Sequence, residues 1–155
     1  MSPAASKRRL ILEAIVSRLE DIALNNGYET DAGLALYTGE IPQLGEDDPT
    51  EAIAVVFGED DPKSLGDGRG FVIRLQAQIS ALCKVSADEP WQRIEMVLAD
   101  IKRAMETNDL TLGGLLTGPF ERSAATQTHP REPGSLTAGI MLPYTLTYKE
   151  GWGAP

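Results

Sequence analysis

The sequence predicts an α+β fold, a mostly antiparallel β-sheet with two main amphipathic helices packed on one face. Segments 71–84 and 136–149 alternate apolar and polar side chains with a period of two, which is typical of strands with one buried face. Segments 6–25 and 90–107 repeat apolar residues at helical spacing. The length of 155 residues predicts a single domain, 1–155, with frayed ends at 1–5 and 150–155.

The first helix is predicted to begin after Ser6, an N-cap residue, and to stop before Gly27, which tolerates a left-handed conformation. Its first turn contains Lys7, Arg8 and Arg9, at the end of the helix where the dipole disfavours cations. Two interpretations stay open. A solvated basic turn is the simpler one, and an acidic partner that holds the turn is the other.

Between the helices the sequence predicts short strands at 34–38 and 53–57, each followed by an acidic loop rich in Gly, Pro and Asp (39–50 and 58–70). Strand 71–84 is long enough to expect a bend or bulge. Asp88 is the expected N-cap of the second helix, with Pro90 in its first turn. A further strand is expected near 120–126. Pro143 lacks a backbone donor and therefore indicates an edge or a bulge in the last strand.

The charge is concentrated in one part of the chain. Acidic residues number 23 and basic residues 14, for a net charge of −9, and the stretch 40–67 alone carries −8 because only Lys63 opposes its nine acids. This distribution disfavours specific nucleic-acid binding, which needs clustered cations. The single cysteine excludes an intrachain disulfide and a cysteine-based zinc site. No apolar run reaches 18 residues and no export signal is visible, so we expect a soluble, intracellular protein without membrane contacts.

Residues suited to catalysis are scarce. His129 is the only histidine, and its position before a proline in a loop favours a solvated side chain over a general base. Cys83 falls on the apolar phase of its strand and is expected in the core. The acidic loops lack the ligand pattern of a calcium loop, and the glycines of 66–70 precede a strand rather than a helix. We therefore predict no catalytic residue, no metal site and no cofactor.

Several local strings carry a resemblance. LILEAIV at 10–16 leads into NGYETDAG at 26–33, PWQRI opens the second helix at 90–94, and YTLTY stands at 144–148. In these strings and in the order of its elements, nearly the whole chain resembles the tail terminator proteins (tail completion, minor tail protein U-like) of long-tailed bacteriophages and prophages.

The resemblance implies a structural protein and not an enzyme. Such a subunit caps the tail tube, ends its polymerisation and helps to form the head–tail joining interface. Its implied partners are copies of itself in a ring, a hexamer when assembled, the tail tube protein and head–tail connector proteins. Its implied location is the virion, at the tail end of the head–tail junction, after assembly in the bacterial cytoplasm. A head–tail connector or neck protein is the alternative, and a metal-dependent hydrolase or an acidic binding module are further ones.

Two surfaces are predicted to make contacts in such an assembly. The acidic residues are expected to form a channel or docking surface, where like charge repels passing DNA; they are Glu46, Asp47, Asp48, Glu59, Asp60 and Asp61. The polar side of the long strands is either a solvent-exposed face of the sheet or a contact with another subunit. The expected subunit or tube contacts are Arg74, Gln76, Gln78, Arg122 and Arg131. The loop 121–135 is predicted to be mobile in the monomer and to order on binding.

Overall fold

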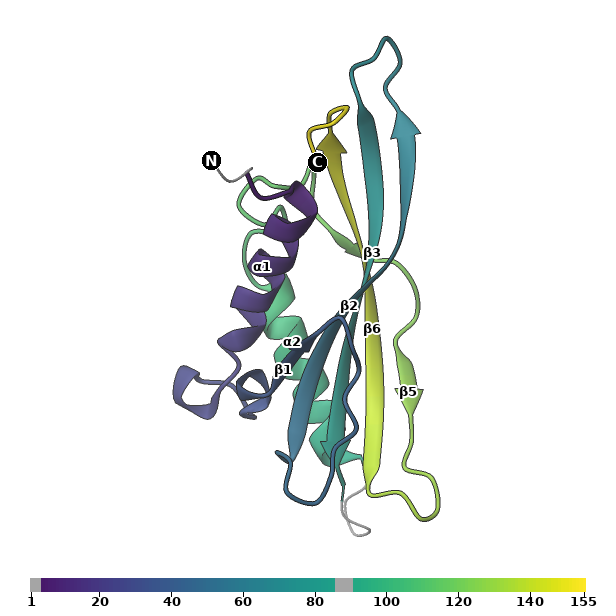
Figure 1. Ribbon diagram of the computed structural model, residues 1–155. Helices are drawn as coiled ribbons and strands as arrows, with labels where there is room; N and C mark the ends of the chain where they lie inside the picture. The colour runs from purple at the N-terminus through teal and green to yellow at the C-terminus, as the bar shows by residue number, and fades with distance from the viewer. Residues whose placement is uncertain (1–3, 86–90) are drawn as a thin grey trace.

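The computed structural model describes residues 4–85 and 91–155 and has two layers. Helices α1 (Lys7–Glu20) and α2 (Gln92–Glu106) cover one face of a mixed six-stranded sheet, and the other face carries no helix (Figure 1). The α+β prediction is therefore confirmed. Within the described ranges no helix has the length and apolar character that crossing a membrane requires. The strands are β1 (Leu36–Thr38), β2 (Glu51–Ser64), β3 (Phe71–Lys84), β4 (Glu121–Arg122), β5 (Gln127–His129) and β6 (Thr137–Glu150).

The centre of the sheet is the antiparallel pair β3–β6. Its register runs without interruption from Phe71 opposite Glu150 to Lys84 opposite Thr137. Strand β2 pairs with the other side of β3, and β1 adds to β2 in parallel. The apolar phase of both long strands faces the helices, as the period of two predicts. The core under the helices includes Ile11, Ile15, Leu19, Leu75, Ile79, Ile101, Met105, Leu142, Leu146 and Tyr148.

The second acidic loop prediction is wrong for most of its length. Residues 58–64 continue β2, and 60–64 pair with β3, so only 65–70 remain as the connecting turn. This half of β2 is exposed on both faces, and a strand without a buried face shows no apolar alternation in its sequence. The expected irregularity is present in β2, between Phe57 and Asp60, rather than in β3.

Local signals at the helix ends behave as expected where the structure describes them. The Ser6 hydroxyl accepts a hydrogen bond from the Arg9 backbone N–H at 3.1 Å, which confirms the N-cap. Helix α1 ends earlier than predicted, and a 3-10 turn, Leu24–Asn26, follows before Gly27, whose φ is 87°. The expected N-cap of α2, Asp88, and Pro90 lie outside the described residues.

Pro143 lies at a point of β6 where no neighbouring strand requires a backbone N–H donor. Its carbonyl accepts from the Ser123 N–H at 3.1 Å, on the side of β6 away from β3. Because the N and C=O of one strand residue point to the same side, the missing donor faces the outer edge, between β4 and β5. Strand β6 is thus an inner strand of the sheet, and Pro143 lies at the gap between β4 and β5 on its outer side rather than on an edge strand or at a bulge.

The last residues of the chain contact the start of β3. Gly151 and Ala154 form an isolated bridge, and the Trp152 ring lies 4.6 Å from the Phe71 ring, centroid to centroid. Fraying at 150–155 concerns motion and stays a prediction.

Candidate interaction surface

The face of the sheet opposite the helices presents polar side chains. Arg74 and Gln76 of β3 stand opposite Thr147 and Thr145 of β6. The Thr145 hydroxyl lies 3.3 Å from the Gln76 side-chain oxygen, to which it donates. Cross-strand partners point to the same side of a sheet, so these side chains form one continuous polar ladder.

A groove of about 480 Å³ runs along this ladder, bordered by β4 and the segment that follows it. It brings together four of the five residues predicted as subunit or tube contacts: Arg74, Gln76, Gln78 and Arg122. The fifth, Arg131, does not line it, and its guanidinium donates to the Ser135 carbonyl at 3.5 Å. The remaining lining residues are Glu121, Ser123, Ala124, Gln127, Met141, Pro143 and Thr145.

A smaller hollow of about 300 Å³ lies further along the same face. Ile41, which is 55% exposed, borders it together with Leu82 and Met141. His129 borders it from β5 and is exposed, in keeping with the expected solvated side chain. The open face thus has a polar half near Arg74 and a more apolar half near Ile41.

A half-exposed charge network on the helix side of the sheet fixes β4, which borders the groove. Arg122 donates to both oxygens of the Glu106 carboxylate, at 2.9 and 2.6 Å, and the Tyr144 hydroxyl donates to the same group at 2.6 Å. Burial by itself raises the pKa of Glu106, but the hydrogen bonds from Arg122 and Tyr144 outweigh it, so that the pKa lies below its ordinary value. Burial and the same carboxylate raise the pKa of the Tyr144 hydroxyl.

Sequence reasoning missed this network. Tyr144 falls on the apolar phase of β6 and reads as a core aromatic, and Glu106 is the last residue of α2, where acids are unfavourable for the helix dipole. An acid at a helix C-terminus is the one signal that pointed to a cationic partner elsewhere in the chain.

The six acidic residues predicted as one surface form two. Glu46, Asp47 and Asp48 lie near the start of β2, where the Lys84 ammonium donates to the backbone carbonyls of Glu46 and Asp48. Glu59, Asp60 and Asp61 lie in the distal half of β2. At about 3.3 Å per residue the two groups are roughly 25–30 Å apart along the strand.

The basic first turn of α1 has an acidic partner within the chain. The Arg8 guanidinium forms an ion pair with Asp60 at 3.1 Å and lies 5.3 Å from the centre of the Phe57 ring. Lys7 donates to the Lys149 carbonyl at 2.8 Å. These contacts fasten the distal half of β2 and β6 to α1, so the interpretation with an acidic partner fits better than a fully solvated turn.

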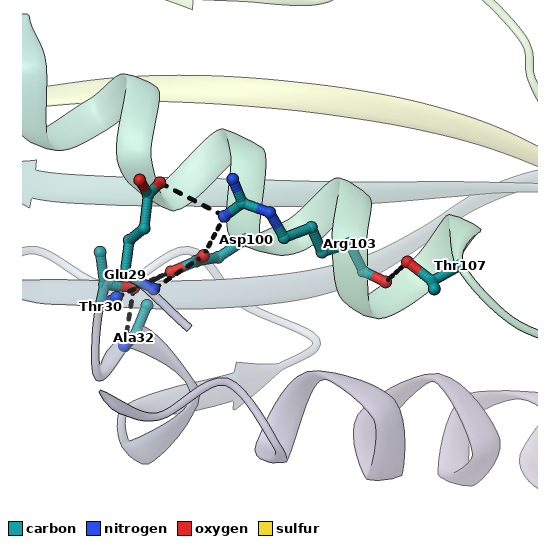
Figure 2. A network of polar contacts seen from close by, with 6 residues as sticks. All are labelled: Glu29, Thr30, Ala32, Asp100, Arg103 and Thr107. Atoms are coloured by element: carbon teal, nitrogen blue, oxygen red, sulfur yellow. Dashed lines mark hydrogen bonds and ion pairs between the residues drawn. The ribbon is translucent and has the colours of Figure 1, made fainter. Parts of the chain in front are cut away.

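Behind the sheet, a buried carboxylate joins α2 to the loop after α1 (Figure 2). The Asp100 side chain is 0% exposed and accepts hydrogen bonds from the backbone N–H groups of Glu29 and Thr30, at 3.1 and 2.8 Å. The Thr30 hydroxyl and Arg103 also donate to it, at 2.8 and 2.9 Å. An acidic residue within the apolar stripe of α2 is the sequence feature that indicates a buried carboxylate at this position.

Nothing in the described part of the chain resembles a reactive centre. Cys83 is buried, as expected, and burial raises the pKa of its thiol to about 12, with a further contribution from the Glu51 carboxylate. Over residues 4–85 and 91–155, no three His, Cys, Asp or Glu side chains gather as a metal ion would require.

At the level of sequence, the chain matches no protein-family profile and no curated protein. Its structure is similar to a chain in the virion of a native gene transfer agent particle, with a TM-score of 0.59 and 15% identity, over 94% of this chain and 99% of that one. The two proteins share a fold. A looser similarity links it to the sheath/tube terminator of an extracellular contractile injection system, with a TM-score of 0.45 and 13% identity, over 99% of this chain and 60% of that one.

Proposed function

We propose that this chain is a tail terminator, a structural subunit that caps the tube of a phage-like tail, ends its polymerisation and helps to form the head-joining surface. The observation that supports this most is the fold shared from end to end with a chain of a gene transfer agent virion. The sequence resemblance to tail terminators points to the same role. Work of this kind is geometric and needs no catalytic group.

In this proposal copies of the chain form a ring, a hexamer when seated on the tube, within the virion at the head–tail junction. A ring closes when one heterologous interface repeats with a fixed rotation. The groove beside β4 is the proposed contact to a neighbouring subunit or to the tube, through Arg74, Gln76, Gln78 and Arg122. Arg131, on the turn before β6, is proposed to contribute to that contact from outside the groove.

The two acidic groups receive separate roles. The loop with Glu46 and Asp47 is proposed as a docking surface. The distal group on β2 is proposed to rim a channel, where like charge keeps DNA from adhering. In that group Asp60 is already paired with Arg8 and Asp61 stands opposite Arg74, so Glu59 is the acid proposed to give the rim its negative charge.

Deletion of the gene from its phage or prophage, followed by electron microscopy of the particles, tests the role. A terminator predicts tails far longer than normal and unattached to heads, and a plasmid copy of the wild-type gene restores the length. Tails of normal length that stay unjoined would instead indicate a head–tail connector. Normal joined particles would contradict both roles.

A further inference from the structure

Three cations gather at the distal end of the open sheet face. Lys63 of β2 and Lys149 of β6 are both cross-strand partners of Val72 on β3. In the next row Arg74 stands between Asp61 and Thr147. Cross-strand partners share a face, and so do residues two apart on one strand, so all three cations project away from the helices. Each is exposed.

The positive charge of these three side chains exceeds the negative charge of the acids in the same two rows. Among the ion pairs of the described residues, none involves Lys63, Arg74 or Lys149 within 4.0 Å. Asp61 is the one acid in the two rows, which leaves a net charge of +2 there in a chain whose total is −9. We call Lys63, Arg74 and Lys149 the basic rows. Such a patch fits an acidic partner.

An acidic surface lies at the other end of the same hairpin. The loop 45–48 is held in shape by Lys84 and by Asp48, whose carboxylate accepts from the Gly45 N–H at 2.6 Å. Glu46 and Asp47 are exposed, and among the described residues their carboxylates form no hydrogen bond or ion pair. The loop therefore presents two negative charges that no cation of residues 4–85 and 91–155 pairs with.

The exposed edge of distal β2 is a poor alternative contact. It carries Pro62, a bulge after Phe57 and a run of charged side chains, which are the features that prevent edge-to-edge strand pairing. The face of the hairpin, rather than its edge, is the surface left for a partner (Figure 1).

We propose that the basic rows of one copy bind the loop 45–48 of the next copy, through Glu46 and Asp47. The two surfaces differ and lie roughly 30–36 Å apart along β2, at about 3.3 Å per residue. Their contact is therefore heterologous, the kind that generates rings rather than two-fold dimers. Opposite charge at such a contact sets the register and speeds association. This inference rests on the proposed function and names the subunit contact within the ring.

A charge swap tests the contact. Self-association of the full chain is measured by analytical ultracentrifugation at about 50 mM salt, where exposed charges are weakly screened. One variant carries K63E, R74E and K149E, another carries E46K and D47K, and a third combines all five. The control, E20K with E95K, makes the same charge change as the second variant on the helix side, where both acids are exposed. Circular dichroism verifies folding of each variant.

If this contact forms, each variant that changes only one side weakens self-association by about tenfold or more, and the control does not. The combined variant regains association, because both sides have changed sign. Failure of the combined variant to recover, or a wild-type chain that stays monomeric up to millimolar concentration, overturns it. So does loss of DNA binding, rather than of self-association, in the basic-row variant. Capping is measured separately, as the length of tail tubes polymerised in the presence of the purified chain. Normal self-association without shortened tubes contradicts the proposed function alone, and normal shortening by both variants that change only one side contradicts this contact alone.

Discussion

The Tyr144 hydroxyl on β6 and the Arg122 guanidinium on β4 donate hydrogen bonds to the same Glu106 carboxylate at the end of α2. Three elements distant in sequence are joined at this one group. Two of them, β4 and β6, also border the groove that we propose as a subunit or tube contact. The network therefore links the stability of the domain to the shape of its interaction surface.

The Glu106 network makes stability depend on acid pH. Because the pKa of Glu106 in the folded chain lies below its ordinary value of 4.5, its contribution is complete above that value and is lost as pH falls through the lower, folded one. Urea unfolding at pH 7 down to pH 3 should show E106Q less stable than the wild type at neutral pH, with a difference that shrinks below about pH 4.5. A difference that stays constant over this range would contradict the assignment.

Removal of the Tyr144 hydroxyl tests the same network from β6. Y144F keeps the buried ring but loses a hydrogen bond to a charged group, so we expect the free energy of unfolding to fall by about 1.5–3 kcal/mol. Y148F is the matched control, because Tyr148 is equally buried and, within the described residues, its hydroxyl has no hydrogen bond. Equal losses in the two variants would show that the Glu106 contact contributes nothing.

Asp100 is expected to be the most costly polar side chain to remove. D100A leaves the N–H groups of Glu29 and Thr30 without their acceptor in a buried place, and should lower the free energy of unfolding by roughly 2–4 kcal/mol. R103A removes only a half-exposed partner of the same carboxylate and should cost less than about 1 kcal/mol. Chemical denaturation of both variants checks the order, and a larger loss in R103A would contradict it.

Arg8 is predicted to stabilise the distal hairpin rather than the whole domain. R8A removes the ion pair with Asp60 and the contact with the Phe57 ring, both partly exposed, so the global loss should stay below about 1 kcal/mol. Amide hydrogen exchange should nevertheless speed up in 58–64. R9A, which breaks a pair within α1 only, is the control. Unchanged exchange in 58–64 would show that α1 does not hold this segment.

Sequence reasoning succeeded where one face of an element is buried. In β3 and β6 the alternation reports the core directly, and the bounds of β3 were predicted to the residue. It failed in 58–64. A strand that is exposed to solvent on both faces has no apolar alternation in its sequence, so only its pairing with β3 shows that it is a strand.

The candidate surface was predictable only in part. The polar phase of β3 indicated Arg74, Gln76 and Gln78, and the structure places them in one groove with Arg122. The separation of the two acidic groups was not predictable, because closeness in sequence suggested one loop surface while an extended strand places them far apart. Likewise, no local pattern could indicate that Lys63 and Lys149 flank the same residue of β3, since this follows only from the register of three strands.

The central claim, that this chain ends tube growth, is tested most directly by the length of tubes grown with and without it. Tail tube protein from the same phage or prophage is polymerised with increasing amounts of the purified chain, and tube lengths are measured by negative-stain electron microscopy. The proposal predicts shorter tubes as the ratio rises, with extra density at one tube end. A length distribution that does not change at any ratio would contradict it.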